Sequence, residues 1–178
     1  MRVKVGDTLL DFTFDTPFEK DKTLYGAAAG KPVFLMFLRY YGCTVCQLDI
    51  RRLKADYDRF LAKGAKVLVV LQSKPELIAE KQGPADLPFD IVCDPEQKLY
   101  RQLEIAPAKS KMGMASLGLI KKMNEAKKEG LTHGEYEGDE LQLPALFLLN
   151  GEGRVEYAHY AKNLTDMPSH DEMLAMLH

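Results

Sequence analysis

The sequence has no apolar run long enough to cross a membrane, and it carries almost no net charge. Its longest unbroken apolar stretches, residues 32–38 and 67–71, fall far short of the roughly 20 residues that a transmembrane helix needs. The first residues lack the apolar segment of a secretory signal, so we expect a cytoplasmic protein. The 24 basic and 26 acidic side chains leave a formal charge of −2. This balance offers no positive field for nucleic acid or an anionic membrane, and we expect neither as a partner.

Cysteine is also scarce, because the chain has only Cys43, Cys46 and Cys93. An odd number this small builds no disulfide framework. In a reducing compartment, two cysteines three positions apart indicate redox chemistry or a metal site rather than a structural cross-link. The 178 residues, 46% of them hydrophobic and 28% charged, are typical of one folded domain spanning residues 1–178.

The order of apolar segments predicts the fold class. Residues 33–38 and 67–71 are continuous apolar runs, typical of strands that are covered on both faces. Between them, apolar side chains recur at helical spacing from Thr44 to Gly64, with charged residues on the opposite face. This alternation predicts an α/β fold whose mostly parallel sheet is flanked by helices. The other expected elements are strands at 12–15 and 89–92, helices at 75–82, 94–103 and 169–177, and a hairpin of strands 145–149 and 155–160.

The stretch 107–134 interrupts this alternation, and we expect it to form a helical insertion. Leu117, Ile120 and Met123 lie on one side of its amphipathic pattern, among several lysines. We expect a solvated surface helix that packs by one face, rather than a docking surface for a partner. The acidic run 135–140 that follows predicts a polar loop rather than a metal site.

A C-x-x-C motif, Cys43 to Cys46, lies directly between a buried strand and a helix. Thr44 and Gln47 match a capping box, which would make Thr44 the N-cap. A sulfur at this position lies near the free N–H groups and the positive dipole end of the helix, which favour thiolate. The second thiol can close an intramolecular disulfide at high effective concentration. We therefore expect both sulfurs to be presented together at the mouth of the sheet, with no bound cofactor.

Two alternatives to redox chemistry remain open. A zinc site would need two ligands besides the C-x-x-C pair, and the candidates are Cys93 and one of His133, His159, His170 or His178. The chain could then be a non-catalytic module that binds a metal or a partner. We expect instead that no metal is bound and that Cys93 fills a small buried site rather than acting as a resolving thiol.

Several further motifs lie along the chain: Gly6-Asp7, Asp11-Phe12-Thr13, Phe37-Leu38-Arg39 before Gly42-Cys43, Cys93-Asp94-Pro95, and Leu143-Pro144-Ala145-Leu146-Phe147. Together they resemble the motifs of the peroxiredoxin-like alkyl hydroperoxide reductase/thiol-specific antioxidant family of the thioredoxin superfamily. The resemblance implies a thioredoxin-like fold with a central mixed sheet, and an antioxidant oxidoreductase. It implies a peroxide or disulfide substrate and a thiol reductant, either a thioredoxin-like protein or a low-molecular-weight thiol. It leaves a homodimer open.

The resemblance assigns the two cysteines in two different ways. In thioredoxin-like members the first cysteine attacks and the second resolves, which would be Cys43 and Cys46. In peroxiredoxins the peroxide-attacking cysteine falls at Cys46, so that Cys46 would form the sulfenic acid and Cys43 would condense with it. The chain departs from the peroxide motif, because Cys43 replaces a hydroxyl residue and Arg39 replaces a proline. These departures favour dithiol chemistry.

The resemblance also indicates a substrate-binding surface. It implies that Pro144 is a cis-proline facing the cysteine pair and that the backbone of Leu143 is offered to substrate. Tyr40 and Tyr41 would flank the same opening. Arg39 is a candidate charge stabiliser in place of the arginine that the family carries before the late strand, although a solvated cap is the simpler interpretation of an arginine at a strand end.

Overall fold

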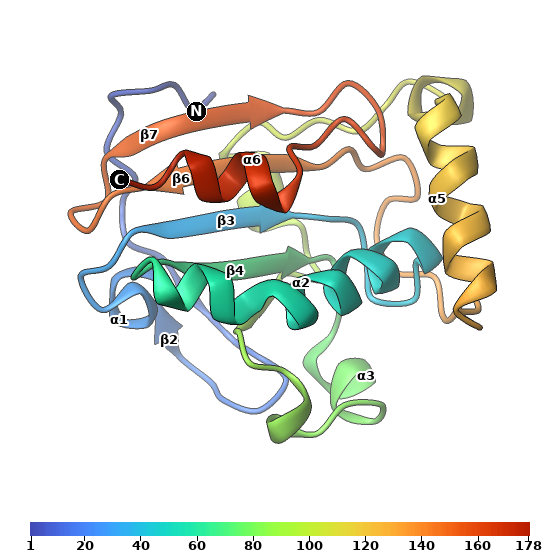
Figure 1. The fold of residues 1–178 in the computed structure, drawn as a ribbon, viewed down its shortest axis with the longest axis horizontal. Helices are drawn as coiled ribbons and strands as arrows, with labels where there is room; N and C mark the ends of the chain where they lie inside the picture. The colour runs from blue at the N-terminus through green and yellow to red at the C-terminus, as the bar shows by residue number, and fades with distance from the viewer.

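A computed structural model describes all of residues 1–178, and its centre is a mixed five-stranded sheet in the order β5-β4-β3-β6-β7 (Figure 1). The parallel strands β3, β4 and β5 are joined by antiparallel β6, and β7 pairs antiparallel with β6. Helices cover both faces. This architecture confirms the α/β fold class with the mixed sheet flanked by helices that the resemblance implies. The mostly parallel sheet expected from the alternation is wrong, because β6 pairs antiparallel with both β3 and β7. The strand bounds are β3 Val33–Phe37, β4 Lys66–Leu71, β5 Ile91–Cys93, β6 Ala145–Leu149 and β7 Val155–Tyr160.

The sheet separates two hydrophobic cores, which explains why β3 and β6 are apolar at every position and β4 at every position after Lys66. In β3, Phe34 and Met36 belong to one core, while Leu35 and Phe37 belong to the other, because successive side chains of a strand point to opposite faces. Two helices, α2 (Thr44–Ala62) and α6 (His170–Ala175), contribute to the first core. Two shorter helices, α1 (Leu24–Ala28) and α4 (Lys98–Gln102), contribute to the second.

The short elements differ in detail from the sequence predictions. The first strand, β1 (Thr13–Phe14), pairs with an unpredicted strand β2 (Lys22–Thr23) in a separate small sheet. Helix α3 spans only Pro75–Ala79 and is followed by a 3₁₀ turn, η1, at Pro84–Asp86. Helix α4 begins at Lys98 rather than near residue 94, because the Asp94 carboxylate accepts the Lys98 and Leu99 N–H groups at 2.9 Å each and forms a turn before the helix.

The expected insertion consists of a 3₁₀ turn, η2 (Lys111–Met114), and helix α5 (Leu117–Lys128). In Figure 1 α5 stands across the N-terminal end of α2. Lys122 and Glu125 of α5 form ion pairs with Asp49 and Arg52 of α2.

The expected packing face of α5 is wrong. Leu117, Ile120 and Met123 are 87%, 59% and 52% exposed, whereas Ala126 is fully buried and Leu119 packs against the first core. The physical reason is that α2 presents charged side chains to α5. The charged and small residues of α5 therefore face inward, and its larger apolar residues remain in solvent.

None of the helices combines the length and the apolar character needed to traverse a membrane.

Candidate active site

The Cys43 sulfur caps helix α2. Cys43, not the predicted Thr44, is the N-cap residue, and its Sγ accepts a hydrogen bond from the Cys46 N–H at 3.4 Å. The expected capping box at Thr44 is wrong by one residue because the Gln47 side chain turns away. Gln47 Nε2 donates instead to the carbonyls of Gly42, at 3.1 Å, and Thr132, at 3.0 Å. The first cysteine itself therefore occupies the position where helix N–H groups favour a negative charge.

Arg39 supplies a positive charge to the same sulfur. Its Nη2 donates to Cys43 Sγ at 3.0 Å, and its Nη1 donates to the carbonyl of Glu140 at 2.6 Å. Its Nε is buried and has no hydrogen-bond partner in the protein. Arg39 is thus not a solvated cap, because its guanidinium bridges the cysteine and a distant loop.

These contacts give the two thiols different proton affinities. A hydrogen bond from the Cys46 thiol and the charge of Arg39 lower the pKa of Cys43 to about 6, although burial opposes this shift. Burial, together with the neighbouring Cys43 sulfur, raises the pKa of Cys46 well above its usual range. At pH 7 Cys43 is therefore mostly thiolate, while Cys46 holds its proton.

Both sulfurs are covered, which contradicts the expectation of an open mouth. Cys43 is 1% exposed and Cys46 is 4% exposed. Residues 131–140, which we call the covering loop, lie over the motif, with the Gly134 N–H donating to the Gly42 carbonyl at 2.8 Å. The small cavity beside Tyr41, Gly42 and Glu135, of about 20 Å³, is lined by neither cysteine. A reactant therefore reaches Cys43 only when this loop moves.

Tyr40 holds the covering loop through its hydroxyl group. Its fully buried side chain donates its hydroxyl to the Glu140 carboxylate, and the same oxygen lies 2.9 Å from His133 Nε2. The His133 ring stacks on the exposed Tyr136 ring, with centroids 4.2 Å apart. Burial and the bond to Glu140 raise the pKa of Tyr40 well above its usual range, so the hydroxyl stays protonated.

Two members of this cluster were not assigned to it from sequence. The acidic run 135–140 indicated only a polar loop, and His133 was weighed only as a metal ligand. Their contacts with Tyr40 span 100 and 93 residues for Glu140 and His133, and no local spacing in the sequence indicates a pairing at that distance.

The other residues predicted to bind substrate, Tyr41, Leu143 and Pro144, make contacts of their own elsewhere in the protein. The Tyr41 hydroxyl accepts a hydrogen bond from Gln82 Nε2 at 2.7 Å, so this ring is engaged towards α3 rather than paired with Tyr40. The chain has no cis peptide bond, and the expectation of a cis Pro144 is wrong. Pro144 is buried and extends the line of β6, with its carbonyl accepting the Ala161 N–H at 3.0 Å. The Leu143 carbonyl accepts from the Gln142 side chain at 3.0 Å.

Cys93 lies at the end of β5 and is 8% exposed. Burial raises the pKa of its thiol to about 12, which leaves it protonated and poorly nucleophilic. No three His, Cys, Asp or Glu side chains gather at a point where they could hold a metal ion. Neither Cys93 nor the histidines therefore join the C-x-x-C pair in a ligand set.

Comparison with known proteins gives a family match and a set of similar structures. A model of the AhpC/TSA family matches residues 5–158. A reduced 2-Cys peroxiredoxin from Plasmodium vivax is 17% identical, with a TM-score of 0.68 over 97% of this chain and 79% of the other. A thiol peroxidase from Chromobacterium violaceum is 16% identical, with a TM-score of 0.66 over 99% and 87%.

A third structure, a peroxiredoxin-like protein from Aquifex aeolicus, is 15% identical, with a TM-score of 0.69 over 99% of this chain and 87% of the other. No curated protein sequence matches the chain. The three structures confirm the thioredoxin-like fold predicted from the sequence.

Proposed function

The chain belongs to the AhpC/TSA family and is a thiol-dependent oxidoreductase of the peroxidase type, and on that premise we propose that Cys43 and Cys46 reduce hydroperoxides by cycling between dithiol and disulfide. The observation that carries this proposal is the convergence on Cys43 Sγ of the Arg39 guanidinium, at 3.0 Å, and the Cys46 N–H, at 3.4 Å. Together they hold a thiolate beside a protonated thiol, which is the pair that this chemistry needs.

In this proposal Cys43 is the attacking cysteine. Its thiolate attacks the terminal oxygen of the hydroperoxide, so that an S–O bond forms, the O–O bond breaks, and the alcohol leaves after taking a proton from the Cys46 thiol. The Cys46 sulfur then displaces hydroxide from the Cys43 sulfenic acid and forms the disulfide. The sum converts one thiolate, one thiol and ROOH into a disulfide, ROH and hydroxide. Arg39 stabilises the negative charge throughout.

This order reverses the one that the peroxiredoxin resemblance implies, in which Cys46 attacks. Two observations support the reversal. The pKa of Cys46 is raised by burial, whereas that of Cys43 is lowered to about 6. Cys43 also lies at the helix N-cap and against Arg39, so both sources of positive potential act on it most directly.

A hydroperoxide fits the geometry better than a protein disulfide does. Both sulfurs are buried, with Cys43 1% and Cys46 4% exposed, and admitting one small molecule requires less movement of the covering loop than admitting a folded partner. Thiol–disulfide exchange with a protein remains the second candidate, because the low pKa of Cys43 suits that attack equally well. Leu143, Pro144 and Tyr41 would then form the surface around the opened loop.

The reductant that closes the cycle is a thiol. The small number of cysteines suits a cytoplasmic setting, in which such thiols keep the Cys43–Cys46 pair reduced.

The test is stopped-flow oxidation by hydrogen peroxide of the wild type and of the Cys43→Ser, Cys46→Ser and Cys93→Ser variants, with dimedone to trap sulfenic acid. We expect Cys46→Ser to accumulate a dimedone adduct on Cys43, Cys43→Ser to react no faster than free cysteine, and Cys93→Ser to match the wild type. An adduct on Cys46 formed at the wild-type rate in Cys43→Ser would reverse the assigned roles. Wild-type oxidation no faster than that of free cysteine would remove the peroxidase proposal.

A further inference from the structure

Helix α5 presents a row of apolar side chains to solvent, which we call its outer face. Leu117, Ile120 and Met123 are all exposed, and each lies three residues from the next, so that they follow one another along one side of the helix. The turn η2, which directly precedes α5, adds Met112, which is 87% exposed. Large apolar side chains gathered in this way mark an interaction surface, whereas single exposed ones do not.

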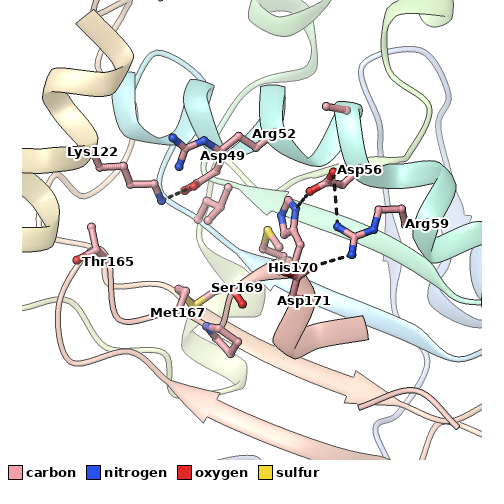
Figure 2. A pocket seen from close by; sticks show the side chains of 14 residues that line it. Asp49, Arg52, Asp56, Arg59, Lys122, Thr165, Met167, Ser169, His170 and Asp171 are labelled. Carbon is pink, nitrogen blue, oxygen red and sulfur yellow. Dashed lines mark hydrogen bonds and ion pairs between the residues drawn. The ribbon is translucent and has the colours of Figure 1, made fainter. Parts of the chain in front are cut away.

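The opposite side of α5 is fixed to the rest of the protein by polar contacts. Figure 2 shows Lys122 reaching Asp49 of α2 at the edge of a cavity of about 500 Å³ between α2, α5 and α6. These two side chains are only 17% and 20% exposed. The start of α5 is held where Ser116 Oγ lies 2.7 Å from Thr165 Oγ1. The outer face cannot turn inward without breaking these contacts, so it stays available to a partner outside the chain.

Lysines surround the outer face. Residues 107–134 contain six lysines and two glutamates, a net charge of +4, whereas the rest of the chain has 18 basic and 24 acidic side chains, a net charge of −6. The total of −2, from which we expected no anionic membrane as a partner, averages over these two unlike parts. The lysines of this segment that are exposed are Lys109, Lys111, Lys121, Lys127 and Lys128. Their local field favours a negatively charged partner.

The type of basic residue favours a membrane over a protein as that partner. The segment 107–134 has no arginine. Protein interfaces are enriched in arginine and depleted in lysine, because the guanidinium group binds carboxylates in a fixed, forked geometry. Lysine is a flexible point charge, which suits the diffuse negative charge of a layer of lipid headgroups. An amphipathic helix that carries several lysines beside apolar side chains is typical of a segment that lies on an anionic lipid surface.

A second copy of the chain suits the outer face less well. The basic segment would have to pair with an acidic surface elsewhere on the other copy. Contacts between two unlike surfaces generate open chains of molecules unless the rotation between copies closes a ring.

We propose that the outer face of α5 docks the protein on an anionic lipid surface. Leu117, Ile120 and Met123 enter the boundary between headgroups and acyl chains, and the lysines contact the headgroups. The helix lies in the plane of the surface and does not cross it. Docking places the N-terminal end of α2, where the C-x-x-C motif lies, beside the membrane, because α5 stands across that end (Figure 1). The inference goes beyond the proposed function and does not depend on the cysteine chemistry.

The first test uses the absence of tryptophan from the chain. Leu117→Trp introduces one indole on the outer face, and Leu61→Trp introduces one at an exposed leucine near the other end of α2. The probe is a vesicle of phosphatidylcholine with about 30% phosphatidylglycerol. We expect the emission of Leu117→Trp to shift to shorter wavelength on these vesicles and to be quenched by brominated acyl chains, and that of Leu61→Trp to show neither change. No shift in Leu117→Trp, or the same shift in both variants, would overturn the inference.

Cosedimentation with the same vesicles measures the apolar contribution. Leu117→Gln and Ile120→Gln should each weaken binding about tenfold, because an apolar side chain no longer leaves water. Both positions are exposed, so these variants should fold like the wild type. Leu61→Gln is the matched control and should bind like the wild type. Binding that is unchanged in Leu117→Gln and Ile120→Gln would mean that the outer face does not enter the lipid.

The charge contribution is measured in the same way. Lys121→Gln/Lys128→Gln should weaken binding about 25-fold, at about fivefold for each lysine near an anionic surface. Lys31→Gln/Lys54→Gln removes the same charge from exposed positions outside the segment and should bind like the wild type. Pure phosphatidylcholine vesicles should bind the wild type weakly. Equal losses in the two double variants would assign binding to the net charge of the chain and contradict docking through α5.

Three further results separate this inference from its alternatives and from the proposed function. Polyglutamate that binds as tightly as the vesicles would assign the outer face to an acidic protein, and a dimer in sedimentation that is lost in Leu117→Gln would assign it to a second copy. Either result would overturn the inference. The Cys43→Ser/Cys46→Ser protein should bind vesicles like the wild type. Vesicle binding without peroxide oxidation of the wild type would reject only the proposed function, and peroxide oxidation without vesicle binding would reject only the docking surface.

Discussion

Arg39 and Cys43 are in direct contact, with Nη2 donating to Sγ at 3.0 Å. The same guanidinium donates through Nη1 to the carbonyl of Glu140 at 2.6 Å. One side chain therefore both stabilises the thiolate and holds the end of the loop that covers it. Access to the sulfur and its reactivity are coupled through this contact.

The pH dependence of Cys43 alkylation should report its low pKa. The thiolate of a group with a pKa of about 6 rises from roughly 10% at pH 5 to roughly 90% at pH 7. We expect the rate of alkylation by iodoacetamide to increase about ninefold over this interval and then to level off above pH 8. A rate that continues to rise towards pH 9 would contradict the low pKa.

Replacing Arg39 should shift the pH profile of Cys43 alkylation to higher pH. Arg39→Met removes the charge and the hydrogen bond on Cys43 Sγ, and loss of such a neighbour raises a pKa by about one unit or more. We expect peroxide oxidation at pH 7 to slow about tenfold or more, because both thiolate and charge stabilisation are lost. Arg39→Lys retains the charge without the forked geometry and should recover part of the rate. An unchanged pH profile in Arg39→Met would show that Arg39 does not lower the pKa of the Cys43 thiol.

Gly42→Ala should displace the covering loop. A Cβ at this position would overlap the Glu135 carbonyl oxygen and lie 2.8 Å from the Glu135 backbone nitrogen. Overpacking of this kind costs about 1–3 kcal/mol, so alkylation of Cys43 should accelerate about five- to a hundredfold. Gly113→Ala is the control, because its Cβ would meet nothing closer than 3.4 Å. Equal alkylation rates in Gly42→Ala and in the wild type would mean that the loop does not limit access.

Tyr40→Phe should loosen the same loop without adding bulk. It removes the hydroxyl that joins Glu140 and His133, a loss of about 1 kcal/mol. Amide exchange at Gly134, whose N–H is bonded to Gly42, should become about fivefold faster. Tyr136→Phe should leave exchange unchanged, since the Tyr136 side chain is exposed. Amide exchange at Gly134 that is equally slow in both variants would show that the Tyr40 hydroxyl does not hold the covering loop in place.

Cys93 should be dispensable for turnover. Its thiol is buried and its pKa is raised to about 12, so we expect Cys93→Ala to retain peroxide reduction within about twofold and to lose about 1 kcal/mol of stability. Mass mapping of the oxidised wild type should find Cys43 joined to Cys46, with Cys93 free. A disulfide that includes Cys93, or an inactive Cys93→Ala protein that is still folded, would contradict this view.

The insertion shows where sequence periodicity fails. Its helix is correctly expected, because spacing at 3.6 residues is a local property. The side by which this helix packs is predicted wrongly, since Leu117 and Ile120 are exposed to solvent while Lys122 and Glu125 form ion pairs with α2. Which side of a short amphipathic helix is buried depends on the neighbouring surface, and here that surface carries charges.

The sequence by itself determined the apolar strands, the C-x-x-C motif between strand and helix, the hairpin and the family to which these motifs belong. Each of these depends on neighbouring residues or on short spacings. Tertiary structure alone placed the Arg39 guanidinium on Cys43 Sγ, which lowers the pKa of that thiol, and placed the covering loop over the motif. Arg39 and Glu140 are 101 residues apart in the chain, and contacts at such separations arise only when the covering loop has packed against the end of β3.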